Sequence, residues 1–303
     1  MQNKLVLVTG GNGFIGRATV DELLNHGYQV RILDREPQAA NNSRTEYIQG
    51  EIENLETVKL AMKNVSWVIH AAAMSRSGPS NQMWNESIQS NIVGTSNVLV
   101  SARESKVKKF VYCGSSTYYG NQSGPQKEDF KPDLLNVYGV TKYAGEQFTK
   151  IFDEVFDLPT ITLRYFNVYG LGQPDDPING LVLGIFLRAK SEGKKVTLDG
   201  GGEQTRDFVE VRDVARANRL ALETSNRNKI INIGSGEKVS IKDLATILEL
   251  NFSIGTPRIG DALTTEADIL NAKNFLNWEP QISLQKGIKD LLAHQDLGPK
   301  KEL

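Results

Sequence analysis

Tyr138 and Lys142 stand four residues apart in the segment Tyr138-Gly-Val-Thr-Lys142, a spacing that could support proton chemistry. Four residues make about one helical turn, so in a helix the phenol and the ammonium would project from the same face. A neighbouring cation favours the phenolate and lowers a pKa that is ordinarily about 10. Tyr138 is therefore a candidate acid/base and Lys142 its electrostatic partner. Such a pair is also common on a solvated helix surface, so its meaning depends on the elements around it.

Composition and charge limit the class of protein. The chain has 303 residues, 39% hydrophobic and 23% charged, which suits one large domain with an appendage or two domains. A net charge of −1 gives no support for nucleic acid or an anionic membrane as a partner. Cys113 is the single cysteine, which excludes an internal disulfide and a cysteine-rich metal site, and we expect no metal. The first apolar run, Leu5–Val8, is too short for a signal peptide or a membrane span, so we expect a soluble, cytoplasmic protein.

A glycine-rich turn follows that first apolar run. A short, continuously apolar segment is typical of a central parallel strand buried on both faces. It leads into Thr9-Gly-Gly-Asn-Gly-Phe-Ile-Gly16 and then into a helical pattern. Gly10 and Gly13 would allow a tight turn and the close approach of a pyrophosphate to backbone N–H groups, and Gly16 would let the helix pack on the strand. Strand, glycine-rich turn and helix together predict a dinucleotide-binding unit.

An acidic residue ends the second predicted strand, Gln29–Leu33. Asp34 lies 24 residues after Gly10, where a carboxylate can accept hydrogen bonds from the ribose diol of an adenosine. It would repel a 2′-phosphate, so Asp34 favours NAD over NADP. Arg35 next to it weakens that preference. Asp34 could also be an ordinary acidic residue in a loop.

The following segments continue an alternation of strands and helices, which indicates an α/β fold. Small residues at Ala71–Ala73 would leave room for a flat ligand against the end of a strand, and hydroxyl residues follow the strand that contains Cys113. Asn91 falls inside a predicted helix, where a buried amide needs partners and could bond active-site backbone. Strands are expected at Glu46–Gln49, Trp67–His70, Phe110–Cys113 and Thr160–Leu163, and helices at Leu55–Met62, around Ile88–Leu99 and from Tyr138 to about Phe156.

Five motifs in order along the chain resemble the extended short-chain dehydrogenase/reductase family, and within it the NAD-dependent nucleotide-sugar epimerases and dehydratases of the UDP-glucose 4-epimerase type. They are Thr9–Gly16, His70–Ala73, Ser115–Gly120, Tyr138–Lys142 and Arg164-Tyr-Phe-Asn-Val-Tyr-Gly170. The resemblance implies a Rossmann-type doubly wound parallel sheet with a smaller α/β C-terminal substrate lobe. Residues 1–170 would form the NAD-binding domain, to which residues of about 204–235 return, and residues 171–303 would mainly form the nucleotide-sugar-binding lobe. Within that lobe we expect a flexible turn over Gly200–Asp207.

The resemblance also implies roles for individual residues. Ser115, Tyr138 and Lys142 would be catalytic, with Ser115 bonding the reacting sugar oxygen. NAD would be bound at Gly10, Gly13, Phe14, Ile15, Gly16, Asp34, Arg35, Glu51, Ile52, Ala71, Ala72, Ala73, Asn91, Tyr138, Lys142 and Tyr165. The nucleotide-diphospho-sugar would be bound at Ser75, Ser115, Ser116, Thr117, Asn167, Leu198, Arg206, Arg258, Asp261 and Thr265, with the two arginines on the diphosphate because a guanidinium can bond phosphate oxygens bidentately.

The implied reaction is inversion at C4 of UDP-glucose, UDP-galactose or their N-acetyl forms through a transient 4-keto sugar. An NAD(P)H-dependent reductase of a nucleotide-linked 4-keto-6-deoxy sugar is the alternative enzyme. The 4,6-dehydratases of the family carry an Asp-Glu pair after the catalytic hydroxyl, where this chain has Ser116 and Thr117, so a dehydratase is not expected. A nucleotide-sensing or scaffold protein without turnover is the alternative of another class, and the intact Ser115, Tyr138 and Lys142 argue against it.

Two departures from the family pattern bear on ligands. Glu51 stands where the family usually has an Asp that reaches the adenine amine, and its longer side chain could still do so. Thr265 stands seven residues after Arg258, at the position that limits room for the 2-substituent of the sugar. Its small side chain predicts tolerance of UDP-N-acetyl sugars.

The family often forms homodimers by packing two helices from each subunit, and we expect a homodimer here. The apolar stripes at Ile88–Leu99 and Phe148–Val155 could form that interface. Burial of the same stripes against the protein's own sheet is an equally good interpretation.

Overall fold

A seven-stranded parallel sheet forms the larger part of the molecule in the computed structural model, which describes residues 5–37, 44–75, 81–176, 180–257 and 260–296. The strand order is β10-β6-β5-β4-β1-β2-β3. The bounds are β1 Leu5–Thr9, β2 Gln29–Asp34, β3 Thr45–Gln49, β4 Trp67–His70, β5 Lys109–Ser115, β6 Thr160–Tyr165 and β10 Lys229–Ile233. Its central strands are apolar and buried, which confirms the expected Rossmann-type α/β fold.

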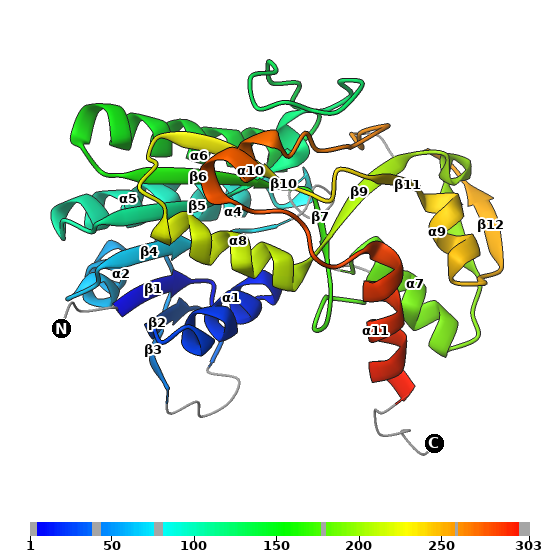
Figure 1. Cartoon of the computed structure of the whole chain (residues 1–303), viewed down its shortest axis with the longest axis horizontal. Helices are drawn as coiled ribbons and strands as arrows, with labels where there is room; N and C mark the ends of the chain where they lie inside the picture. The colour runs from blue at the N-terminus through cyan, green and yellow to red at the C-terminus, as the bar shows by residue number, and fades with distance from the viewer. Residues whose placement is uncertain (1–4, 38–43, 76–80, 177–179, 258–259, 297–303) are drawn as a thin grey trace.

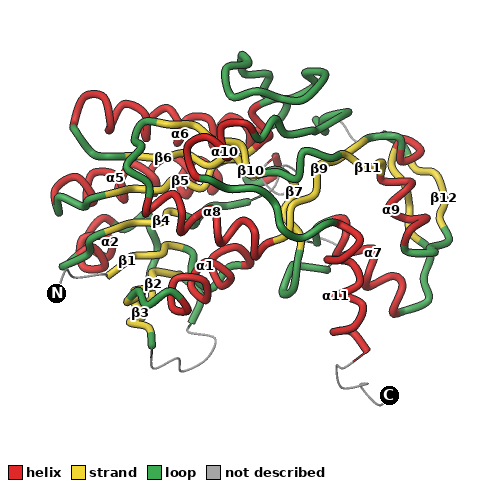
Figure 2. Tube along the Cα trace, in the orientation of Figure 1, coloured by secondary structure: helices red, strands yellow, loops and turns green. Residues whose placement is uncertain are grey.

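Helices cover both faces of this sheet (Figure 1, Figure 2). One face packs on α1 (Phe14–Asn25), α8 (Val211–Glu223) and α10 (Leu270–Leu276). The other packs on α2 (Leu55–Met62), α5 (Thr95–Glu104) and α6 (Val137–Phe156). The helices on the two faces leave the carboxyl ends of the strands uncovered. Folds of this kind bind ligands at that edge of the sheet.

A smaller lobe lies beside the carboxyl ends of the strands and has its own apolar core (Figure 1). It contains a three-stranded sheet of order β11-β9-β7 and a two-stranded sheet of β12 and β8. The bounds are β7 Asn167–Tyr169, β8 Val196–Asp199, β9 Thr205–Glu210, β11 Lys238–Ser240, β12 Phe252–Gly255, α7 Val182–Ser191, α9 Ile241–Ile247 and α11 Leu284–Asp296. The chain leaves the large sheet after β6 and returns to it with α8 and β10, so the two parts are interleaved in sequence.

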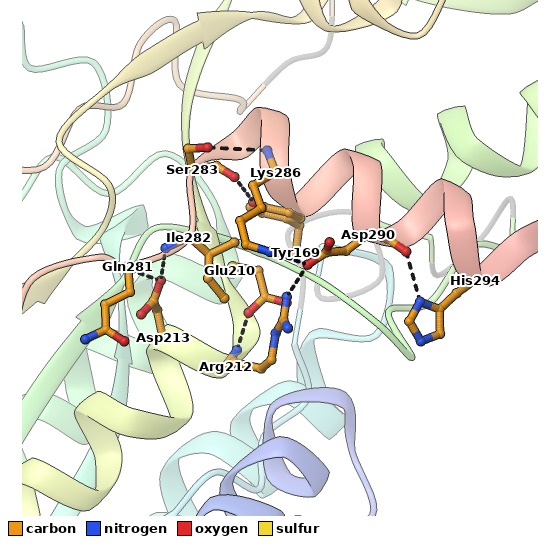
Figure 3. A network of polar contacts seen from close by, with 10 residues as sticks. All are labelled: Tyr169, Glu210, Arg212, Asp213, Gln281, Ile282, Ser283, Lys286, Asp290 and His294. Atoms are coloured by element: carbon orange, nitrogen blue, oxygen red, sulfur yellow. Dashed lines mark hydrogen bonds and ion pairs between the residues drawn. The ribbon is translucent and has the colours of Figure 1, made fainter.

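Polar contacts attach the last helix to the point where the chain passes back toward the large sheet (Figure 3). Arg212 pairs with the buried Glu210 at 3.0 Å and with Asp290 on α11 at 3.0 Å. The carboxylate of Asp213 accepts hydrogen bonds from the backbone N–H groups of Gln281 and Ile282, at 2.9 and 3.0 Å. These contacts attach α11 and the segment before it to the start of α8.

Local sequence explains where α6 begins. Asn136 caps the helix, because its side chain accepts a hydrogen bond from the Gly139 N–H at 2.9 Å. Tyr138 therefore lies in the first turn. The neighbouring helical segment contains α4 (Trp84–Ile88) and a π-helical turn over Gln89–Gly94, a feature found frequently at functional sites.

The expected turn over Gly200–Asp207 is wrong at its end. Strand β9 begins at Thr205, because Arg206 and Asp207 pair with Val239 and Lys238 of β11. Long-range pairing thus makes a strand from polar residues whose own preference for strand is weak.

In the described residues, no helix has the length and hydrophobicity to cross a membrane.

Candidate active site

A cleft of about 800 Å³ runs along the carboxyl ends of the parallel strands and into the smaller lobe. Its wall combines backbone from the glycine-rich turn with side chains from both parts of the molecule. Most of the residues selected from the sequence line it: Gly10, Gly13, Phe14, Ile15, Gly16, Asp34, Arg35, Glu51, Ile52, Ala71, Ala72, Ala73, Ser75, Ser115, Ser116, Thr117, Tyr138, Tyr165, Asn167, Arg206, Asp261 and Thr265.

The glycine-rich turn leaves no room for side chains at two positions. A Cβ on Gly16 would lie 2.0 Å from the Gly10 carbonyl oxygen, and one on Gly10 would lie 2.7 Å from the Ala72 backbone. Gly10 also has φ +70°, which L-residues rarely adopt. The turn places the N-terminus of α1, which begins at Phe14, beside the cleft. These residues fit a dinucleotide pyrophosphate, because they offer close backbone approach and a helix N-terminus.

Asp34 ends β2 with its carboxylate held in place by backbone. Its Oδ2 accepts from the Asn12 N–H at 2.8 Å and its Oδ1 from the Glu36 N–H at 3.1 Å. Only 9% of Asp34 is exposed. Arg35 points instead to Glu36, at 3.7 Å in an exposed pair. The arrangement suits recognition of a ribose diol. Because Arg35 is directed to Glu36, it weakens the preference for NAD over NADP less than the sequence alone indicated.

The helix α6 presents Tyr138 to the cleft and buries Lys142 one turn later. Lys142 is 5% exposed, and its Nζ lies 4.3 Å from the ring centroid of Tyr112. Burial lowers the pKa of Lys142 to about 8, while Cys113 and Glu146 oppose that shift. Ser115, at the end of β5, accepts hydrogen bonds from the Thr117 N–H at 3.2 Å and the Thr117 hydroxyl at 2.9 Å. The Ser115 hydroxyl can therefore donate its own proton into the cleft.

Asn91 lies behind the wall of the cleft and does not line it. Its side chain accepts from the Met74 N–H at 2.8 Å and donates to the Met74 carbonyl at 3.0 Å and to the Thr141 hydroxyl at 2.9 Å. The expectation that a buried Asn91 bonds backbone near the site is confirmed in this form. The amide connects the segment after Ala73 to α6.

His70 and Cys113 are both buried beside α6, and both are held neutral. Burial lowers the pKa of His70 to about 3 and raises the pKa of the Cys113 thiol to about 11. His70 lies between the hydroxyls of Thr9, at 2.7 Å, and Thr95, at 3.0 Å. Neither side chain lines the cleft, so both are part of the supporting structure.

The smaller lobe contributes a cation and a set of hydroxyl and amide groups. Arg206 is partly buried, and its Nη1 donates to the Thr205 carbonyl at 2.8 Å. Burial lowers the pKa of Arg206, and the nearby Asp261 opposes the shift. In the described part of the chain Arg206 forms no ion pair within 4.0 Å, which is the state expected of a cation that receives an anionic ligand. Thr265 Oγ1 accepts from Asn167 Nδ2 and from the Asp207 N–H, both at 3.1 Å.

One residue predicted to bind the substrate, Leu198, does not line the cleft. Leu198 is fully buried in the core of the smaller lobe, and its neighbours Thr197 and Asp199 line the cleft instead. The reason is strand alternation, since successive residues of β8 face opposite sides. Arg258 lies outside the described residues.

Sequence reasoning missed several residues of the wall. Asn12 lies inside the glycine motif but was not predicted to be a site residue, although its backbone N–H donates a hydrogen bond to the Asp34 carboxylate. Further missed residues come from the start of α7 and from short segments of the lobe that carry no motif of their own, among them Leu181, Val182, Leu183, Ile185, Phe186, Thr197, Asp199, Gln204, Phe208 and Ile241.

Comparison with known proteins agrees with this geometry. The model of the NAD dependent epimerase/dehydratase family matches residues 6–234. A putative UDP-glucose 4-epimerase of Methanocaldococcus jannaschii is 35% identical, covering 94% of this chain and 96% of that one. A UDP-glucuronate 4-epimerase of Thermodesulfobacterium geofontis is 33% identical, covering 93% of each. The crystal structure of a UDP-glucose 4-epimerase of Thermotoga maritima with UDP-glucose superimposes with a TM-score of 0.90, at 31% identity over 97% of this chain and 100% of that one.

The chain belongs to the NAD-dependent epimerase/dehydratase family. Its fold is that of the extended short-chain dehydrogenases, and the expectation of an NAD-dependent enzyme that epimerises nucleotide sugars is confirmed.

Proposed function

We propose that this protein inverts C4 of a UDP-hexose, with UDP-glucose and UDP-galactose as the basal pair of substrates. The observation that supports it best is the continuity of one cleft. The same cleft is lined by the glycine turn and Asp34, by Ser115 and Tyr138, and by Arg206. A dinucleotide and a nucleotide-sugar can therefore meet at the phenol.

The residues that would hold NAD are the glycine turn, Asp34 and the backbone of Ala71–Ala73. NAD, when bound, supplies reversible acceptance of hydride from C4. Arg206 would bind the diphosphate, with Asn167 and Asp261 near it on the wall. Binding through the diphosphate leaves the sugar itself free to turn, as inversion at C4 requires.

Within this cleft the chain's own residues would transfer one proton from the sugar and back to it. The phenolate of Tyr138 would accept the proton of the C4 hydroxyl as the alcohol becomes a ketone, and would return it to the same oxygen after the sugar has turned. Lys142 would stabilise the phenolate. The Ser115 hydroxyl, which already accepts twice from Thr117, would donate to the reacting oxygen.

Turnover without added cofactor tests this function. We expect purified protein to carry NAD, seen by mass spectrometry of the denatured supernatant, and to interconvert UDP-glucose and UDP-galactose with no cofactor added. A reductase would fail this assay and would oxidise NADH or NADPH stoichiometrically with a nucleotide-linked 4-keto sugar. UDP-glucuronate belongs in the panel because one relative is a UDP-glucuronate 4-epimerase; turnover of that substrate alone would replace UDP-glucose as the assignment.

We further propose that N-acetyl sugars are accepted. The support is Thr265, a small side chain on the cleft wall whose Oγ1 is held by Asn167 and by the Asp207 backbone. Turnover of UDP-N-acetylglucosamine should lie within about tenfold of UDP-glucose, and Thr265→Tyr should remove it while sparing UDP-glucose. No acetylated activity beside good glucose activity would refute this part.

We also propose a cytoplasmic homodimer that packs through α6 and the helical segment at residues 84–104. Five apolar residues of α6 are exposed rather than buried against the sheet: Val140 at 49%, Phe148 at 40%, Ile151 at 44%, Val155 at 63% and Phe156 at 41%. Of the predicted stripe only Phe152 is buried, at 9%. A double charge substitution, Ile151→Asp with Val155→Asp, should convert a dimer into a monomer in sedimentation. A wild-type monomer at micromolar concentration would refute the proposal.

A further inference from the structure

A buried ion pair connects strand β6 to the catalytic helix outside the wall of the cleft. Arg164 donates to both carboxylate oxygens of Glu146, from Nε at 2.8 Å and from Nη2 at 2.7 Å. The two side chains are 1% and 4% exposed. The Arg164 guanidinium also lies 3.6 Å from the ring centroid of Tyr118. A bidentate, stacked and buried guanidinium leaves little freedom of position.

Glu146 shares a helical face with the catalytic pair. Tyr138, Lys142 and Glu146 are spaced by four residues, so they follow one another along α6. Arg164 pairs in register with Gly114, the residue before Ser115. The ion pair therefore fixes the axial and rotational position of α6 relative to the strand end that carries Ser115.

The same guanidinium is connected through polar contacts to the segment that follows Thr265. Its Nη1 donates to the Tyr119 hydroxyl at 2.8 Å, and that hydroxyl donates to Asn232 Oδ1 at 2.6 Å. The Asn232 side chain donates to the carbonyls of Gln126 and Asp268, at 2.8 and 3.1 Å. Asp268 follows Thr265 by three residues. The network thus joins the catalytic helix to the segment that carries a residue of the sugar site.

Stability alone does not account for such a pair, because apolar residues of similar volume often stabilise a buried site as well or better. We propose that Arg164 and Glu146 are positioning residues for epimerisation: they hold Tyr138 in one place relative to Ser115 while the bound sugar turns. This inference rests on the 4-epimerase function proposed above. Neither residue lines the cleft, so neither acts on the sugar directly.

Glu146 has an electrostatic effect that a purely structural contact would lack. The titratable groups facing Lys142 are His70 on β4, Tyr112 and Cys113 on β5, and Glu146 with Tyr138 on α6. Burial raises the pKa of Tyr112 and of Cys113 and lowers that of His70, so these three are neutral near pH 7. The Glu146 carboxylate raises the pKa of Lys142 against burial. Its removal should make Lys142 lose its proton at a lower pH.

Three variants of the full-length holoenzyme test the proposal. Glu146→Gln removes the anion, Arg164→Lys keeps the cation but loses the bidentate fork, and Glu22→Gln is the control. Glu22 pairs with Arg219 between α1 and α8 at 2.7 Å, with 20% and 13% exposed, away from the cleft. For each we measure kcat, KM, the pH profile of kcat, the melting temperature and the NAD that co-purifies.

We expect kcat of Glu146→Gln to fall roughly 10- to 100-fold with KM within about threefold, because a misplacement of about 1 Å has that effect on rate. The alkaline decline of kcat should begin roughly half a pH unit lower. Arg164→Lys should lower kcat about tenfold without that downward shift, and Glu22→Gln should match the wild type. NAD content should be unchanged in all three.

The proposal is overturned if Glu146→Gln has wild-type kcat and a wild-type pH profile well below its melting temperature. If that variant does not fold, the pair Arg164→Met with Glu146→Leu leaves no unpaired buried charge and receives the same measurements. Wild-type kcat and pH profile in this double variant would overturn the proposal in the same way. Failure of the underlying function looks different, since the wild type and Glu22→Gln would then be inactive on every UDP-sugar; that result refutes both.

Discussion

The two halves of the cleft are built in different ways. The half proposed to hold the cofactor comes from consecutive residues at strand ends, within 10–16, 34–36, 50–53 and 71–73. The half proposed to hold the nucleotide-sugar comes mainly from short segments scattered between 167 and 265. The first is fixed by the hydrogen-bonded register of the parallel sheet, and the second depends on a few buried side chains that hold loops together.

Asp207 is the main one of these side chains. It is fully buried, and its two carboxylate oxygens accept from the Ser235 N–H and hydroxyl, at 2.6 and 2.7 Å, and from the N–H groups of Gly236 and Ala267, both at 2.9 Å. One carboxylate thus joins β9 to the segments after β10 and after Thr265. We therefore expect the regular sheet to tolerate many single substitutions. In the loop-built half, one substitution can separate the segments that form the wall.

The largest effect should come where the halves meet. Tyr138→Phe removes the proton acceptor but keeps the ring, so kcat should fall about 10³-fold, within the range of general acid–base catalysis. Both halves should still bind their ligands. The measurement is kcat with UDP-galactose, together with NAD content and UDP affinity. Unchanged turnover would show that the phenol is not the acid/base.

A change confined to the cofactor half comes next. Gly16→Ala places a Cβ 2.0 Å from the Gly10 carbonyl oxygen, so the affinity for NAD should fall more than tenfold, which is roughly 1.4 kcal/mol or more of binding free energy, and co-purified NAD should fall with it. Asp21→Ala is the control, since this residue is exposed on the same helix and does not line the cleft. Equal NAD content in the two variants would contradict the steric argument.

A change confined to the substrate half should weaken binding of the UDP-sugar without changing binding of NAD. Asp207→Asn replaces two acceptor oxygens by one acceptor and one donor facing N–H groups, which leaves buried donors unpaired at about 1–3 kcal/mol. KM for the UDP-sugar should rise about tenfold while NAD content stays constant. Asp243→Asn, on the exposed surface of α9 in the same lobe, should change neither. Loss of NAD from Asp207→Asn would mean that the halves are not separable.

The smallest effect is on pH dependence. Burial lowers the pKa of Lys142 from its usual 10.5 to about 8, so kcat should decline severalfold above about pH 8 as Tyr138 loses its cationic partner. The contribution of Lys142 to stability has the opposite sign. Between about pH 8 and 10.5 the unfolded chain binds the proton that the folded chain has released, so this contribution rises with pH. Circular dichroism at each pH separates the two, and a flat kcat up to pH 9.5 would contradict the assignment.

Sequence alone predicts the cofactor half better than the substrate half, and the cause is physical. Gly10, Asp34 and Tyr138 each sit at a fixed offset from a strand or on a helix, so local patterns place them. Leu198 was placed in the cleft by position, but strand alternation turns it into the core and brings Thr197 and Asp199 to the wall. Arg206 was expected in a turn, and only pairing with β11 makes its segment a strand. Long-range contacts of this kind leave no local signal.

The return of the chain to the large sheet has a consequence for synthesis on the ribosome. Strand β10 covers the edge of β6, and α8 covers α1's side of the sheet, yet both follow β7, β8 and β9 in sequence. A nascent chain that has emerged only to Gly170 would expose an unpaired strand edge and an uncovered apolar face, which favour aggregation. The nucleotide-binding part therefore completes its folding only after much of the second lobe has left the exit tunnel, and cutting the gene at residue 170 should yield an insoluble fragment.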